Sequence, residues 1–71
     1  MEAREIRLLT TEEISERLDD AYRELFALRR ELAMGRLEDY NRIEVVKRDI
    51  ARMRTILRER ELAAELVEEA V

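Results

Sequence analysis

Apolar residues recur at alternating spacings of four and three through the first half of the chain. They are Ile14, Leu18, Ala21, Leu25, Leu28 and Leu32. This spacing predicts a helix that packs one apolar stripe against another helix. Thr10 and Glu13 have the spacing of a capping box, and Leu9 and Ile14 hold the flanking hydrophobic-staple positions. We therefore expect the first helix to begin at about residue 10.

A second stripe follows in the other half of the chain. Its residues are Ile43, Val46, Ile50, Met53 and Leu57. Gly35, the only glycine, follows the first stripe and can adopt the left-handed conformation that ends a helix. Asp39 or Asn41 can cap the second helix. The pattern predicts one domain spanning residues 1–71, with a helix at about 10–34, a turn at 35–38, a helix at about 39–66 and an acidic tail.

A connection this short makes the two helices antiparallel neighbours. The predicted fold class is therefore all-α, an antiparallel two-helix hairpin with a coiled-coil-like seam. Residues 1–9 are amphipathic but short, and we expect them to form only a loose helical turn. Four apolar residues flank the seams with no second layer to cover them: Tyr22, Phe26, Val45 and Ile56. Such a hairpin is expected to be marginally stable alone and to need a partner surface.

The composition excludes several function classes. Charged residues make up 45% of the chain, and there is no proline, cysteine or histidine. Disulfides, the usual zinc sites and the common nucleophile–base pairs are therefore absent. No apolar run is long enough to cross a membrane, and the N-terminal residues lack the pattern of a signal peptide. We expect a cytoplasmic protein with no membrane contact, cofactor, metal or small-molecule substrate.

Charge is distributed unevenly along the chain. The net charge is -4, yet residues 23–58 carry ten bases and six acids. Within the second predicted helix, Lys47, Ala51, Arg54 and Arg58 fall in a strip about 60° wide, because each residue advances about 100°. Arg48 and Thr55 lie just beyond it. A cationic strip with one small residue in its middle allows close approach of a polyanion backbone, which suggests a phosphate-facing surface.

The residues alone leave other interpretations open. The strip can be a solvated face whose bases pair with nearby acids, as in Glu44–Arg48. The seams are also compatible with a homodimeric coiled coil that acts as a protein-interaction adaptor. Catalysis is disfavoured because no predicted pocket gathers the carboxylates. A helical chorismate mutase, which residues 25–32 faintly resemble, needs a third long helix that this pattern does not predict.

Several blocks of the sequence resemble one known family. They are Glu24-Leu-Phe-Ala-Leu-Arg29, Ala33-Met-Gly-Arg-Leu37, Arg42-Ile43 and the run from Val46 to Arg60. Together they resemble the bacterial large ribosomal subunit protein twenty-nine family over about residues 4–61. The resemblance implies a non-enzymatic structural constituent of the large subunit. It also implies binding to ribosomal RNA near the polypeptide exit tunnel, beside neighbouring ribosomal proteins and the docking area for nascent-chain factors.

The resemblance also implies which residues contact the RNA. They are Arg29, Arg42, Lys47, Arg48, Arg52, Arg54, Thr55 and Arg58. Arg36 departs from the family pattern, which usually has a glutamine there, and is expected to add a contact. For Tyr22 and Phe26, core packing or contact with a neighbour is favoured over stacking on bases, and Tyr40 is expected to cover the end of the hairpin. The tail after residue 61 is acidic and is expected to face solvent or protein, because RNA phosphates repel it.

Overall fold

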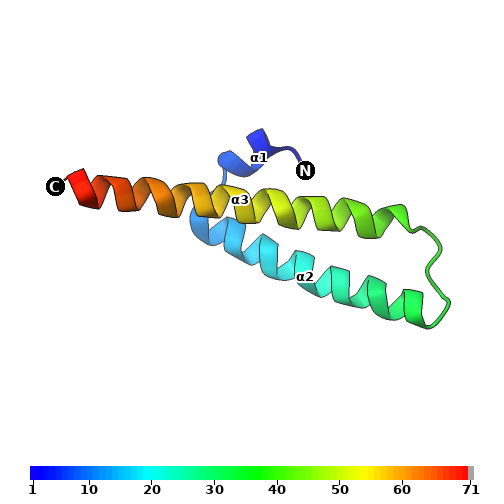
Figure 1. The fold of residues 1–71 in the computed structure, drawn as a ribbon. Coiled ribbons are helices and arrows are strands. Elements are labelled where there is room, and N and C mark those ends of the chain that lie inside the picture. The colour runs from blue at the N-terminus through cyan, green and yellow to red at the C-terminus, as the bar shows by residue number, and fades with distance from the viewer. Residues whose placement is uncertain (71) are drawn as a thin grey trace.

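The computed structural model describes residues 1–70, and side chains of residues 1–69. Over this range the chain forms α1 (Ala3–Arg7), α2 (Thr11–Ala33) and α3 (Asn41–Ala70) (Figure 1). The two long helices run antiparallel and pack against each other along their apolar stripes. The all-α class and the antiparallel hairpin predicted from the sequence are both confirmed.

Local interactions at both ends of α2 explain its bounds. The backbone N–H of Glu13 donates to Thr10 Oγ1 at 3.1 Å, and the N–H of Thr10 donates to Glu13 Oε1 at 3.3 Å. At the other end Gly35 has a φ of +72°, and the N–H of Arg36 donates to the carbonyl of Glu31 at 2.8 Å. This is the glycine-dependent helix stop expected from the sequence.

The loop of residues 34–40 leads into α3. Asp39 Oδ1 accepts the backbone N–H of Asn41 at 2.9 Å at the start of this helix. The helix starts two residues later than the predicted position 39 and continues past residue 66 to Ala70. Residues 61–70 contain only glutamate, leucine, alanine and valine. Glutamate, leucine and alanine are good helix formers, so nothing local ends the helix at the predicted position.

The core has two parts along the hairpin. Near the loop, Leu25 packs with Val46 and Ile50. At the far end, Ile14 of α2 packs with Met53 and Ile56 of α3 and with one residue of the N-terminal segment. That residue is Ile6, which is fully buried. The N-terminal segment therefore belongs to the core.

The position of α1 corrects two expectations from the sequence. Residues 1–9 contain a helix docked on α3, and Ile56, expected to lie uncovered, is only 4% exposed. Arg60 holds the junction between α1 and α2 against α3. Its guanidinium donates to the carbonyls of Leu9 at 2.8 Å and Arg7 at 3.3 Å, and to Thr11 Oγ1 at 3.0 Å. A five-residue helix is unstable alone, so this packing maintains it.

The molecule is elongated, with principal extents of 55 × 19 × 15 Å. Its radius of gyration is 15.3 Å, whereas a compact chain of this length has about 11 Å. The end of α3 projects beyond α1 and α2 (Figure 1), and the side chains of residues 61–69 are exposed. Among the described helices, none is long and apolar enough to cross a membrane. The shape leaves most side chains at the surface.

Candidate nucleic-acid interface

The two long helices present two different sides. Leu25 of α2 and Ile50 of α3 belong to the same core cluster. In each helix, the residues three before, one after and four after this core residue lie on one flank, roughly 40–100° around the axis from it. Two antiparallel helices are related by an approximate two-fold axis perpendicular to the plane that contains both helix axes. Residues at the same offset from Leu25 in α2 and from Ile50 in α3 therefore lie on the same side of the hairpin.

We call this flank the open side. Its residues are Tyr22, Phe26 and Arg29 from α2, and Lys47, Ala51 and Arg54 from α3. Arg58, eight residues after Ile50, lies about 80° around the axis and so belongs to the same flank. All seven residues are exposed. The opposite flank, which we call the covered side, is where α1 packs. There Glu24 of α2 and Asp49 of α3 each precede their core residue by one position. The Met1 amino group lies 3.1 Å from Asp49 Oδ1, which ties the start of the chain to the covered side.

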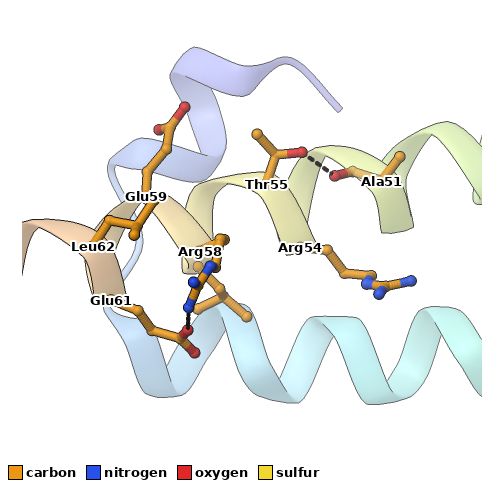
Figure 2. Close-up of a pocket in the computed structure, with 8 residues that line it drawn as sticks. Ala51, Arg54, Thr55, Arg58, Glu59, Glu61 and Leu62 are labelled. Atoms are coloured by element: carbon orange, nitrogen blue, oxygen red, sulfur yellow. Dashed lines mark hydrogen bonds and ion pairs between the residues drawn. The ribbon is translucent and has the colours of Figure 1, made fainter.

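The open side of α3 contains a shallow depression (Figure 2). It is lined by Ala51, Arg54, Thr55, Leu57, Arg58, Glu59, Glu61 and Leu62. In Figure 2, Arg54 and Arg58 extend from α3 toward α2 in the lower half of the view, whereas Thr55 and Glu59 extend toward α1. Ala51 leaves room between the cationic side chains, so an extended anionic chain can lie close to the helix.

Exposed ion pairs lie at both ends of the cationic strip of α3, formed by Lys47, Ala51, Arg54 and Arg58 and called the α3 strip below. Lys47 Nζ lies 3.8 Å from Glu44 Oε1, and Arg58 donates to Glu61 Oε2 at 2.8 Å. Each pair joins residues three apart on one helix, a geometry that contributes about 0.3–0.5 kcal/mol. Glu44 pairs with Lys47, and not with Arg48 as in the solvated-face interpretation. Pairs this weak can be replaced by a phosphate.

Arg54 has no ion pair or side-chain hydrogen bond within residues 1–70, and the same holds for Arg48. Arg48 lies at the outer edge of α3 beside the strip. Thr55 lies at the same edge, and its hydroxyl donates to the carbonyl of Ala51 at 2.9 Å. The Thr55 oxygen remains able to accept a hydrogen bond, while its proton is used within the helix.

Two of the predicted RNA-binding arginines lie on the covered side instead. Arg42 Nε donates to Glu24 Oε1 at 2.7 Å, an ion pair that links α3 to α2. Arg52 donates to the carbonyl oxygen of Met1 at 2.8 Å. The helical spacing put these residues in the basic segment, but α2 and the N-terminal residues supply their partners. Their predicted RNA contacts stay untested.

The remaining two predicted residues lie outside α3. Arg29 is on the open side of α2, where its exposed side chain adds a cation opposite the α3 strip. Arg36 is in the loop after Gly35 and is exposed beside Leu37, Glu38 and Asp39. The structure thus brings Arg29, Lys47, Arg54 and Arg58 onto one side of the hairpin and leaves Arg36 at its end.

Two aromatic side chains also lie on the open side, and sequence reasoning did not place them beside the cationic strip. Tyr22 and Phe26 are 43% and 68% exposed, as expected for residues that no second layer covers, so of the two alternatives given for them core packing is wrong. Tyr22 and Phe26 stand three residues before and one residue after Leu25, as Lys47 and Ala51 stand relative to Ile50. This equal spacing is the sequence signal that places the aromatic residues on the same side as the cationic strip. Tyr40, expected to cover the end of the hairpin, lies directly before α3 and is 64% exposed.

Fold and surface define a small helical-hairpin protein with one cationic side, suited to attachment to a polyanion. No cluster of potential metal ligands is present in the part of the chain that the structure describes. A family model described as "Ribosomal L29 protein" matches residues 4–60. The chain belongs to this family.

Individual relatives agree with the family match. The chain is 58% identical to the large ribosomal subunit protein uL29 of Geobacillus stearothermophilus over 64 residues, covering 90% of this chain and 97% of the relative. It is 52% identical to the protein of the same name from Clostridioides difficile, covering 87% and 92%, respectively. The family predicted from the sequence blocks is confirmed, and the chain is a ribosomal protein and not an enzyme.

Proposed function

We propose that this protein is a structural constituent of the large ribosomal subunit that binds ribosomal RNA through its open side. Its relatives carry the name of a large-subunit protein. We further propose that it works in the bacterial cytoplasm, on the subunit surface near the polypeptide exit tunnel, which is the location that the family resemblance implies. Neighbouring ribosomal proteins and factors that act on the nascent chain are the protein partners that this location implies.

The observation that carries the proposal is the difference between the arginines on the two sides. Arg42 and Arg52 are engaged by groups of the protein itself, whereas Arg54 on the open side has no such partner within residues 1–70. A guanidinium displaces counterions from RNA and forms two parallel hydrogen bonds to phosphate oxygens. Lys47, Arg54 and Arg58 form the centre of the contact, with Arg29 opposite them and Arg48 and Thr55 at its edge.

The recognition is expected to depend on the shape of the RNA backbone. The deep groove of an RNA helix is too narrow for side chains to read, so contacts go to phosphates and 2′-hydroxyls. The α3 strip, with three cationic residues and one small residue in its middle, fits this type of contact. The end of α3 carries four glutamates and no base from residue 61 to residue 70. It is therefore expected to point away from the RNA.

The test is a salt titration of binding to fragments of large-subunit ribosomal RNA. The triple variant Lys47→Glu/Arg54→Glu/Arg58→Glu is expected to lose at least tenfold in affinity at about 0.1 M salt. The slope of log affinity against log salt is expected to fall by about 2–3, because each lost phosphate contact removes nearly one released counterion. Filter binding or fluorescence anisotropy measures both quantities.

A matched control makes the same charge change elsewhere. The variant Arg4→Glu/Arg17→Glu/Arg23→Glu alters three exposed arginines outside the open side. It is expected to retain most of the affinity and to join large subunits in cosedimentation, while the open-side variant does not. Equal losses in both variants would show that the binding is non-specific charge attraction. A salt-insensitive dimer would favour the coiled-coil adaptor instead.

A further inference from the structure

Phe26 is the only phenylalanine in the chain, and it is 68% exposed. Burying a phenylalanine side chain stabilises a protein, and this chain lacks most of that stabilisation at Phe26. Within residues 1–70 no element covers this flank of α2, because α1 packs on the other side of the hairpin. The exposed ring is therefore available to a partner molecule.

The surroundings of the ring resemble a stacking surface. The guanidinium carbon of Arg30 lies 5.9 Å from the ring centroid, within the range of a cation–π contact. Tyr22, one turn earlier on the same flank, is 43% exposed. Aromatic rings and arginine planes are the groups on which proteins stack unpaired nucleobases.

The charge around the ring favours RNA over a protein as the occupant. Asp20 pairs with Arg23 at 3.0 Å, so Arg29 and Arg30 are the cations that count beside the ring. Within residues 22–30 the one acid is Glu24. That acid lies on the covered side, where it pairs with Arg42. Phe26 shares the open side with Lys47, Arg54 and Arg58, so one RNA element can contact α3 through its phosphates and reach Phe26 with an adjacent base.

We propose that Phe26, supported by Arg30 and Tyr22, stacks on an unpaired nucleobase of the RNA whose backbone the α3 strip binds. This inference rests on the proposed function and adds a second class of contact to it. The α3 strip supplies salt-dependent affinity along the backbone. The aromatic site supplies a preference for RNA that has an unpaired nucleotide beside the bound helix.

The experiment uses the full chain and the ribosomal RNA fragment that binds it in the salt titration. Each unpaired nucleotide of the fragment is replaced in turn by the fluorescent base 2-aminopurine, whose emission changes when it stacks. One position is expected to respond severalfold more than the others on binding the unmodified chain. Phe26→Leu is expected to abolish that response and to weaken binding about tenfold, because the stacking of one base on an aromatic ring is lost.

Two controls separate stacking from general effects. Phe26→Trp keeps an aromatic face and is expected to retain both the response and the affinity. Leu8→Ala removes another highly exposed apolar side chain, at the junction of α1 and α2, and is expected to change neither. Phe26→Leu leaves charge unchanged, so its salt slope is expected to equal that of the unmodified chain.

The outcomes distinguish this inference from the proposed function. If Phe26→Leu binds as tightly as the unmodified chain while the α3 triple variant does not, stacking is overturned and RNA binding by the strip stands. If Phe26→Leu leaves RNA affinity unchanged but weakens incorporation into large subunits, the ring contacts a protein and the inference is again overturned. Failure of the α3 triple variant to alter binding overturns the proposed function, and the inference with it.

Discussion

The covered and open sides of the hairpin use similar residues for different purposes. On the covered side, Arg42, Arg52 and Arg60 donate to groups of the same chain. On the open side, no contact within residues 1–70 buries Phe26 or pairs Arg54. A basic residue in a helix therefore indicates nothing about binding until the elements packed beside it are known. The comparison predicts that covered-side substitutions change stability and open-side substitutions change RNA affinity.

The largest stability effect is expected for Ile6→Ala. Ile6 is fully buried between α1, α2 and α3, and truncating such a side chain costs about 2–4 kcal/mol. In a domain this small, that loss lowers the melting temperature by more than about 10 °C. Thermal unfolding followed by circular dichroism measures it. A loss below about 1 kcal/mol would contradict the docking of α1.

Arg60→Gln tests the same side through hydrogen bonds. Three donated hydrogen bonds join Arg60 to the segment between α1 and α2, and their loss is expected to cost about 1–2 kcal/mol. Urea denaturation measures the change in the free energy of unfolding. The matched variant is Arg58→Gln, which loses only an exposed pair with Glu61 and is expected to stay within about 0.5 kcal/mol. Equal effects would mean that Arg60 does not hold the junction.

The smallest stability effect, and the closest comparison, comes from two arginines two residues apart. Arg54→Gln is expected to leave the free energy of unfolding within about 0.5 kcal/mol and to weaken RNA binding roughly fivefold. Arg52→Gln removes the same charge from the covered side and is expected to change RNA affinity less than twofold. Its stability loss is expected to reach about 0.5–1 kcal/mol, because the bond to the Met1 carbonyl is lost. If the two variants weaken RNA binding equally, the two sides do not differ in function.

How far the sequence predicts the structure depends on whether the cause is local. The start of α2 was predictable because Thr10 and Glu13 bond to each other within one turn. Its end was predictable because Gly35 alone tolerates the left-handed backbone there without strain. The docking of α1 was not predictable, since a five-residue helix forms only through contacts distant in sequence.

The candidate site was predictable in part for the same reason. Helical spacing alone places Lys47, Arg54 and Arg58 on one strip. Helical spacing does not show that α1 packs on the other flank of the hairpin. Because α1 packs there, Arg52 contacts the N-terminal residues of the protein itself and Phe26 is left exposed. The spacing of Tyr22 and Phe26 fits a widened seam as well as an exposed flank. Only the position of α1 distinguishes a widened seam from an exposed flank.

The most direct test of the account is an electron cryo-microscopy structure of bacterial large subunits that carry this chain. If the open side binds RNA, ribosomal RNA phosphates lie within hydrogen-bonding distance of Arg54 and Arg58, and α1 lies on the side of the hairpin that faces away from that RNA. RNA packed against α1, with Arg54 and Arg58 directed into solvent, would contradict it.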